Sequence, residues 1–262
     1  MTSARGDFDP SRDRGLLLGD GLFETVLAEE GRLVRFEAHA ARLTRGCAIL
    51  GLPAPEASVL EMAARAALTE ACLADARAAV RLTWTAGPGG RGLDRPADLA
   101  PRLIVAASPS PRPSGPASLA VASVRRNPNS PTSRLKTLAY LDNVLARREA
   151  LAAGADEALM LNTAGEVACA AAANLFWIAG GRLFTPALNC GALDGVVRAM
   201  VLERAAALKV LAIEAQEGLE ALAVADAVFL TNSLIGVRPV SRLGERLYGP
   251  HVLVERLGQN LA

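Results

Sequence analysis

The sequence contains almost no lysine. Its 262 residues include 26 arginines but only two lysines, Lys136 and Lys209. On a surface both side chains are solvated cations, but only lysine can lose its proton when buried and then act as a nucleophile or base. Lys209 lies near the end of a predicted helix, where a cation complements the helix dipole. Lys136 lacks such an explanation and is therefore our candidate for chemistry.

Side chains that bind metals are also scarce. None of the four cysteines forms a CxxC pair, and the two histidines are distant from them in sequence. Cysteine and histidine are the usual ligands of structural zinc, so we expect no metal site. The residues concerned are Cys47, Cys72, Cys169, Cys190, His39 and His251.

Net charge, aromatic content and the length of apolar runs exclude further classes of protein. The net charge is +1 and aromatic residues make up 4% of the chain, too little for a nucleic-acid surface. No run of about eighteen apolar residues predicts a transmembrane helix. Residues 1–15 are charged and lack the apolar core of a signal peptide. We expect a cytoplasmic protein with free thiols, whose partner is a small molecule rather than nucleic acid or membrane.

A segment rich in proline, serine and glycine divides the chain. SPSPRPSGPAS, residues 108–118, follows the apolar run RLIVAAS and has the composition of a linker. We therefore expect a small N-terminal α/β domain over residues 1–107 and a larger C-terminal domain over residues 119–262.

Hydrophobic periodicity predicts mixed helices and strands without strict alternation, so we assign the α+β class. Strands are expected at 21–29, 31–36, 78–86, 102–108, 118–124, 157–162, 173–180, 181–186, 209–215, 227–232 and 237–243. Helices are expected at 37–51, 58–76, 138–154, 194–208 and 251–262.

Several short stretches have features of ligand sites, although each is weak alone. Val196 and Val197 begin a predicted helix after a glycine, and helix starts bind anions. The polar residues 231–233 follow a buried strand. Arg42 lies on a predicted helix, and the GPGGRG loop offers Arg91 but lacks the order of a nucleotide-binding glycine loop.

Together these stretches resemble the class IV aminotransferases, which are fold-type IV pyridoxal phosphate enzymes. The family includes branched-chain aminotransferase, D-amino-acid transaminase and aminodeoxychorismate lyase. The GGRGL loop and DEAL…NLFW are most similar to the lyase branch. The motifs that carry the resemblance, in order, are GDGLFETV at 19–26, HAARL at 39–43, LKTLAYLDNVLARREA at 135–150, DEALMLN at 156–162, NLFW at 174–177, LDGVVRAM at 193–200 and TNSLIGVRPV at 231–240.

The resemblance implies a role for Lys136. It matches the lysine that holds pyridoxal phosphate covalently in this family. That bond needs a primary amine, which a guanidinium cannot replace. Once released, the same amine is expected to move the substrate's proton.

The resemblance also implies contacts for the rest of the cofactor and for the substrate. Arg42 matches the arginine that binds the cofactor phosphate, together with the backbone of Val196 and Val197. Ser233, with Asn232 beside it, matches a hydroxyl that binds the same phosphate. Tyr140 is similar, with a gap of one residue, to a tyrosine near the cofactor's phenolic oxygen. Arg91 and Thr25 are the residues expected to contact the substrate.

One position departs from the family in a way that affects chemistry. The family has a glutamate facing the pyridine nitrogen, five residues before the asparagine of NLF. Here Cys169 stands five residues before Asn174. Glu166 is the nearest acid, but in a regular strand an offset of three residues points to the opposite face, so only a bulge would let it substitute. Cys169 is therefore included among the residues expected beside the cofactor.

Two smaller departures concern the N-terminus and residue 139. About a dozen polar residues precede DRG, where family members have a strand and turn, which suggests a misassigned start or a missing strand. Ala139 stands where relatives often carry asparagine.

The leading interpretation is a homodimeric lyase that converts 4-amino-4-deoxychorismate to 4-aminobenzoate and pyruvate in folate synthesis. One alternative is an aminotransferase for D- or branched-chain amino acids. Another is a catalytically impaired homologue that only binds cofactor or ligand, because Cys169 replaces the glutamate.

Overall fold

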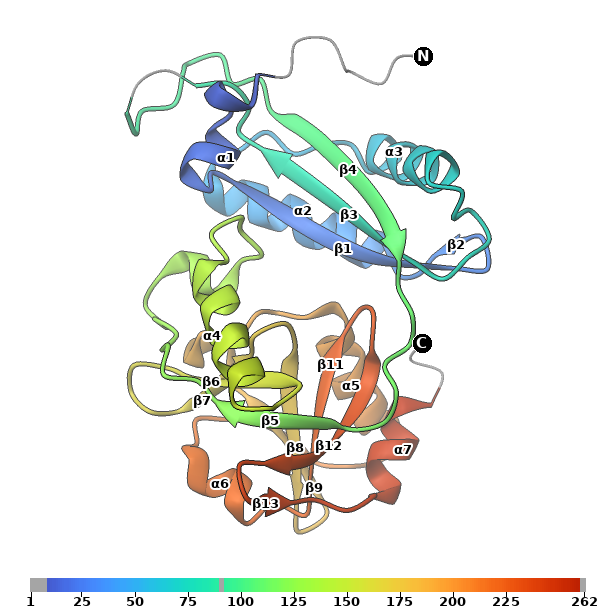
Figure 1. Ribbon diagram of the computed structural model, residues 1–262, viewed down its shortest axis with the longest axis vertical. Helices are drawn as coiled ribbons and strands as arrows, with labels where there is room; N and C mark the ends of the chain where they lie inside the picture. The colour runs from blue at the N-terminus through green and yellow to red at the C-terminus, as the bar shows by residue number, and fades with distance from the viewer. Residues whose placement is uncertain (1–8, 90–91, 260–262) are drawn as a thin grey trace. The chain divides into compact units, whose positions relative to one another are not determined.

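The computed structural model describes residues 9–89 and 92–259 (Figure 1). The chain forms two compact units. Unit 1 comprises Met1–Pro111 with Lys136–Ala139, and unit 2 comprises Arg112–Leu135 with Tyr140–Ala262. The proline-rich connection between them is shorter than its composition suggests, because β4 runs through Pro109 and β5 begins at Ala117.

Unit 1 is built on a four-stranded antiparallel sheet in the order β2-β1-β3-β4. The strands are β1 (Gly21–Glu29), β2 (Arg32–Leu33), β3 (Ala78–Thr85) and β4 (Arg102–Pro109). Helix α2 (Phe36–Leu50) packs against β1, and α3 (Ala57–Glu70) packs against β3 and β4 (Figure 1). Gly46 of α2 permits a close approach, because a Cβ there would lie 2.8 Å from a methyl group of Leu22.

A short helical region precedes this sheet. The 3-10 turn Pro10–Arg12 leads into α1 (Arg14–Leu18). Asp13 caps α1 by accepting the backbone N–H of Gly15 and of Leu16. The helix ends at Gly19, whose φ of +68° places it in the left-handed region.

Residues 136–139 lie with unit 1 because they pair with the edge of β1. The N–H of Phe23 donates to the carbonyl of Lys136 at 2.9 Å, and the N–H of Leu138 donates to the carbonyl of Gly21 at 3.0 Å. The chain thus returns to the first unit for these four residues before continuing in the second.

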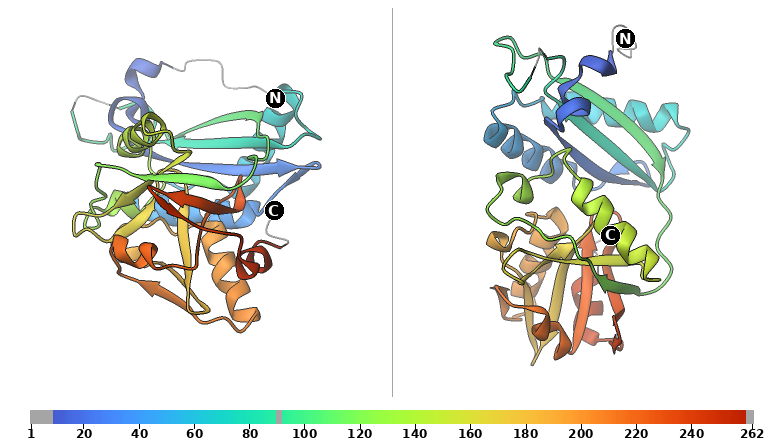
Figure 2. Two further views of the ribbon diagram at one scale, coloured as in Figure 1. Left: turned by 60° about the horizontal axis from the view of Figure 1, so that its bottom comes forward. Right: turned by 60° about the vertical axis from the view of Figure 1, so that its left-hand side comes forward.

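Unit 2 contains a mixed sheet whose main path is β10-β9-β8-β11-β12-β5-β6-β7 (Figures 1 and 2). β12 pairs with β5, and β5 with β6, in parallel, whereas β8, β11 and β12 pair antiparallel. The strands are β5 (Ala117–Val121), β6 (Glu157–Leu161), β7 (Val167–Ala170), β8 (Asn174–Ala179), β9 (Arg182–Pro186), β10 (Ala212–Ala215), β11 (Ala227–Asn232), β12 (Gly236–Leu243) and β13 (Arg246–Leu247).

Helices cover this sheet. α5 (Val196–Ala207) and α7 (Val252–Gly258) pack together against β11 and β12 respectively, over a core in which the rings of Phe176 and Phe229 stack 5.0 Å apart. α4 (Leu141–Ala152) packs against β5 and β6, and α6 (Leu219–Ala223) precedes β11. The mixture of helices and strands confirms the predicted α+β class.

Candidate functional site

Lys136 lies in a strongly charged part of unit 1. Its amine is 4.1 Å from the ring centroid of Phe23, and the guanidinium of Arg81 is 3.8 Å from the same centroid. Phe23 and Thr25 alternate with Glu24 along β1, so their side chains lie on the sheet face opposite to that of Glu24. Thr25 is half-buried and pairs with Arg81 of the neighbouring strand.

The surroundings of Lys136 favour the neutral amine. Desolvation, together with the positive charges of Arg42 and Arg81, lowers the pKa of Lys136 to about 8, and the carboxylate of Glu24 opposes this shift. A lysine with such a pKa supplies far more unprotonated amine near neutral pH than an exposed lysine does. This is the property that a nucleophilic or proton-transferring lysine requires.

Glu24 organises the helix side of this cluster. Its carboxylate, 1% exposed, accepts hydrogen bonds from Nε and Nη2 of Arg42 at 2.7 and 2.6 Å, and its Oε2 lies 2.7 Å from Nδ1 of His39. Burial alone raises the pKa of Glu24, but Arg42 and then His39 outweigh it and lower that pKa to about 2. The carboxylate therefore stays ionised and fixes the plane of the Arg42 guanidinium.

Glu24 and His39 were not singled out for the site from the sequence. A signal was present, because Glu24 interrupts the apolar strand GLFETVLAE, and His39 and Arg42 are three residues apart on one helix face. An acid inside an apolar strand needs a cation, and those two residues provide cationic and imidazole partners.

In unit 2, the start of α5 has the form of an anion site. Gly195 is the N-cap and supplies no side-chain cap, so the helix begins at Val196 and Val197 with backbone N–H groups that lack helical partners. A Cβ at Gly195 would lie 2.0 Å from Oδ1 of Asn174, so only glycine fits there. Asn174 is held in place by donating from Nδ2 to the carbonyl of Leu193 at 2.8 Å.

The loop after β11 carries the remaining residues expected near the phosphate. Asn232 donates from Nδ2 to the carbonyl of Ala172 at 2.9 Å, and its Oδ1 accepts the N–H groups of Leu234 and Ile235. Its amide therefore shapes the turn around Ser233, which is half-buried.

Cys169 lies on β7 and is 6% exposed. Burial, the largest effect, raises the pKa of its thiol; the charge of Arg126 opposes this and that of Glu157 adds to it. The thiol is therefore neutral at physiological pH. It cannot supply the negative charge of a carboxylate at this position.

A β-bulge changes the position expected for Glu166. Cys169 pairs with Met160, but Val167 pairs with Leu161, so two steps along β7 match one step along β6. The bulge breaks the regular alternation on which the expectation for Glu166 depends, so alternation no longer decides which way its side chain points. The Glu166 carboxylate is engaged locally, since it accepts from Nδ2 of Asn162 at 2.7 Å.

Tyr140 is half-buried and forms the N-cap position of α4. Arg91 lies outside the described residues. Among the expected site residues, unit 1 brings Lys136 and Arg42 together, whereas unit 2 holds Tyr140, Cys169, Val196, Val197, Asn232 and Ser233.

A family model described as "Amino-transferase class IV" matches residues 21–243. The chain belongs to this family. Class IV aminotransferases are enzymes, and the whole of the site described above lies within the matched range, which confirms the resemblance drawn from the motifs.

The relatives of this chain carry the names of two different enzymes. The aminodeoxychorismate lyase of Bacillus subtilis is 33% identical, with 90% of this chain and 82% of that protein covered. A putative branched-chain-amino-acid aminotransferase of Methanocaldococcus jannaschii is 31% identical, with the same two shares covered. The crystal structure of 4-amino-4-deoxychorismate lyase from Pseudomonas aeruginosa matches with a TM-score of 0.87 and 35% identity, covering 98% of this chain and 94% of that one.

Among the described residues, no helix has the length and apolar character needed to cross a bilayer. None of the four cysteines forms a disulfide bond.

Proposed function

We propose that this class IV enzyme is a pyridoxal phosphate-dependent lyase that converts 4-amino-4-deoxychorismate to 4-aminobenzoate and pyruvate. The observation that carries the proposal is the place of the Lys136 amine, 4.1 Å from the ring centroid of Phe23, where desolvation and nearby charges lower its pKa to about 8. It is supported by the similarity to aminodeoxychorismate lyases over about nine tenths of the chain.

The residues present fit the cofactor at both of its ends. Lys136 offers a desolvated primary amine, which would bind the cofactor covalently. The glycine-capped start of α5, with Val196 and Val197, would bind the phosphate, and the resemblance gives a phosphate-binding role to Ser233 and to Arg42 as well. Tyr140 would approach the phenolic oxygen and Cys169 the pyridine ring.

When bound, pyridoxal phosphate withdraws the electrons released as a bond to the amino-bearing carbon breaks. Lys136 would take up and return the substrate's proton, because its amine exchanges protons near neutral pH. Arg42 would keep the phosphate fixed, since Glu24 holds its guanidinium rigidly. Thr25 and Arg91 would contact the substrate.

Cys169 favours the lyase over the aminotransferase in this proposal. A neutral thiol does not hold a proton on the pyridine nitrogen, so the bound cofactor withdraws electrons less strongly. Transamination depends on that withdrawal throughout. Release of pyruvate is also driven by formation of an aromatic ring, and it therefore tolerates the thiol better.

The first test is visible absorption of the purified full-length protein with pyridoxal phosphate. A band from covalently bound cofactor is expected in the wild type and in Lys209→Ala, and not in Lys136→Ala. Pyruvate release from 4-amino-4-deoxychorismate should follow the same pattern. Absence of the band in the wild type would contradict the proposal and favour a relic that only binds other ligands.

The second candidate is an aminotransferase for D- or branched-chain amino acids, favoured by the M. jannaschii relative. Amino transfer that depends on a keto acid, without pyruvate release from the aminochorismate, would support it. We also propose that the protein is cytoplasmic, forms a homodimer and acts in folate synthesis. Analytical ultracentrifugation would test the homodimer.

A further inference from the structure

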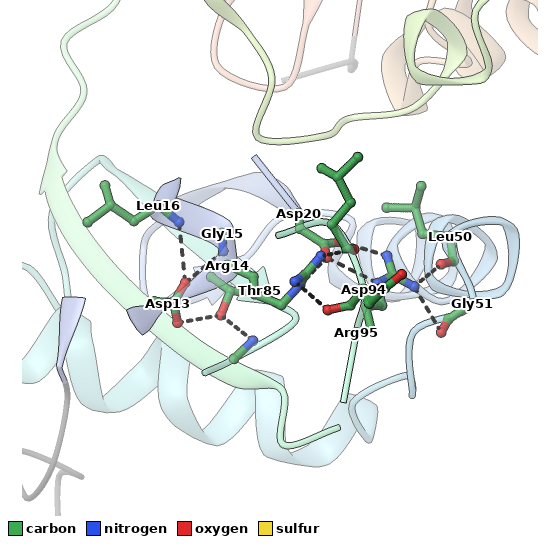
Figure 3. Close-up of polar contacts among 12 residues, drawn as sticks. Asp13, Arg14, Gly15, Leu16, Asp20, Leu50, Gly51, Thr85, Asp94 and Arg95 are labelled. Atoms are coloured by element: carbon green, nitrogen blue, oxygen red, sulfur yellow. Dashed lines mark hydrogen bonds and ion pairs between the residues drawn. The ribbon is translucent and has the colours of Figure 1, made fainter. Parts of the chain in front are cut away.

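A partly buried ionic cluster lies immediately before β1 in unit 1 (Figure 3). Its centre is Asp20, whose side chain is 11% exposed. Oδ2 accepts from Nε of Arg14 at 2.9 Å and from Nε of Arg95 at 3.0 Å, and Oδ1 accepts from Nη2 of Arg95 at 2.6 Å. Burial by itself raises the pKa of Asp20, but the hydrogen bonds from Arg95 and Arg14 lower it by more than burial raises it. The pKa therefore lies below its ordinary value, and the carboxylate stays ionised.

The two arginines extend this cluster to three separate segments. Arg14 donates to the carbonyls of Leu93 and Asp94 at 2.8 and 2.9 Å. Arg95 donates to the carbonyl of Leu50 at 2.5 Å, at the end of α2. Asp20 thus joins α1, α2 and the segment 93–95 at one point.

Asp20 is also next to the residues that hold the lysine segment. Its carbonyl accepts the N–H of Ala86 at 2.9 Å, and the carbonyl of the following Gly21 accepts the N–H of Leu138 at 3.0 Å. A Cβ on Gly21 would lie 2.4 Å from the carbonyl oxygen of Trp84, so the start of β1 is packed tightly. Asp20 is therefore linked to residues 136–138 through the backbone of Gly21.

We propose that Asp20 is a positioning residue for Lys136: by joining Arg14 and Arg95 it fixes the start of β1, and β1 in turn holds the backbone of the lysine segment. The side chain of Asp20 does not approach the amine. It acts through one strand, and the consequence is that the amine stays over the Phe23 ring, where the charges of Arg42 and Arg81 act on it. The inference rests on the proposed function only in taking Lys136 as the reactive amine.

The two lysines of the chain permit a direct test that does not depend on activity. The full-length protein without cofactor is treated with acetic anhydride over a range of pH, and peptide mass spectrometry measures acetylation at each lysine. Only the neutral amine reacts, so the midpoint of the pH profile reports the amine's pKa. The exposed Lys209, which lies far from residues 136–139 in sequence, serves as the internal standard for the extent of reaction.

Two variants distinguish a positioning role of Asp20 from a direct effect of its charge on the pKa of Lys136. Asp20→Asn removes the negative charge, whereas Arg95→Lys keeps its positive charge but loses the fork that binds both carboxylate oxygens. Positioning predicts that the Lys136 midpoint rises in both variants, by about one pH unit in Asp20→Asn, as the amine leaves its desolvated place. Asp13→Asn, which removes a buried carboxylate of the same region that caps α1, should leave the midpoint unchanged.

Two outcomes would overturn the proposal. A midpoint that stays constant in both variants, with only a lower Tm, would mean that Asp20 is purely structural. A midpoint that falls in Asp20→Asn and does not move in Arg95→Lys would mean a through-space charge effect. Arg95 is 29% exposed, so Arg95→Lys decides the question even if Asp20→Asn does not fold. Failure of the wild type to bind pyridoxal phosphate would contradict the proposed function without changing this result.

Discussion

At the scale of the residue, ionised groups control the properties of their neighbours. Glu24 keeps its charge only because Arg42 and His39 surround it, and it partly offsets the effect of two arginines on Lys136. The sequence identified Lys136 and Arg42 through their motifs. It did not indicate that Glu24 pairs with His39 and Arg42. These residues are 15 and 18 positions from Glu24 in sequence and become its neighbours only after β1 and α2 pack together.

We predict that Glu24→Gln destabilises the fold in a manner that depends on pH. The native pKa of Glu24 is about 2, below the ordinary value of 4.5, so its contribution is complete above pH 4.5 and disappears as the pH falls toward 2. The shift corresponds to a free energy on the order of 3 kcal/mol. Urea unfolding at several pH values should show a large difference from wild type at neutral pH and a smaller one in acid.

Glu61→Gln is the matched control for that measurement. Glu61 pairs with Arg65 across one turn of α3, where both side chains are exposed to solvent. Such a pair contributes less than about 1 kcal/mol. An equal loss of stability in both variants would contradict the role assigned to Glu24.

We predict that Cys169→Glu raises the ratio of transamination to pyruvate release. Arg126, which already acts on the thiol, would favour the charged form of a glutamate there, and this charge would strengthen electron withdrawal by the cofactor. The ratio is measured with the two assays on cofactor-loaded protein. Cys169→Ser, which remains neutral, should behave like the wild type, and an unchanged ratio in Cys169→Glu would disprove the hypothesis.

At the scale of the element, periodicity predicted most strands and helices but missed β7 and its bulge. The sequence of β7, VACA, has a single β-branched residue and lies within an alanine-rich run, so its propensity for a strand is weak. Pairing with β6 forms this strand, and local sequence does not encode that pairing. The same reason applies to Glu166, whose face depends on a bulge that regular alternation cannot predict.

We predict that Gly195→Ala weakens binding of pyridoxal phosphate. The new methyl group would collide with Oδ1 of Asn174 and displace the first turn of α5, whose N–H groups are the proposed phosphate ligands. Titration followed by visible absorption should show a dissociation constant raised by about tenfold or more. Gly249→Ala, whose methyl group would meet nothing within 4 Å, should bind like the wild type.

At the scale of the whole molecule, the two units share the chain in an interleaved order. The linker at 108–118 was predicted from composition, but residues 136–139 join unit 1 through backbone hydrogen bonds, which composition does not report. The chain therefore crosses between the two units three times, after Pro111, Leu135 and Ala139, and unit 1 cannot unfold completely unless the lysine segment leaves β1.

We predict that cutting the exposed connection leaves the two pieces associated. A protease site placed at residues 112–115 separates most of unit 1 from the rest of the chain, but residues 136–139 of the second piece remain bonded to β1. Gel filtration without denaturant should show one species of unchanged size. Leu138→Pro removes an N–H donor of this pairing and should make the cut pieces separate more readily; separation of the cut wild type would contradict the interleaved arrangement.

The same interleaving has a consequence for synthesis on the ribosome. β2 pairs with β1 only at Ala28 and Glu29, so the carbonyl of Gly21 and the N–H of Phe23 stay without their strand partners until residues 136–138 have left the exit tunnel. The nascent first unit thus carries an open strand edge while some thirty further residues are made, and such edges promote association between chains. Lys136, the proposed reactive amine, lies in the peptide that closes this edge, so the sheet edge of unit 1 is closed and the lysine is put in place in one event.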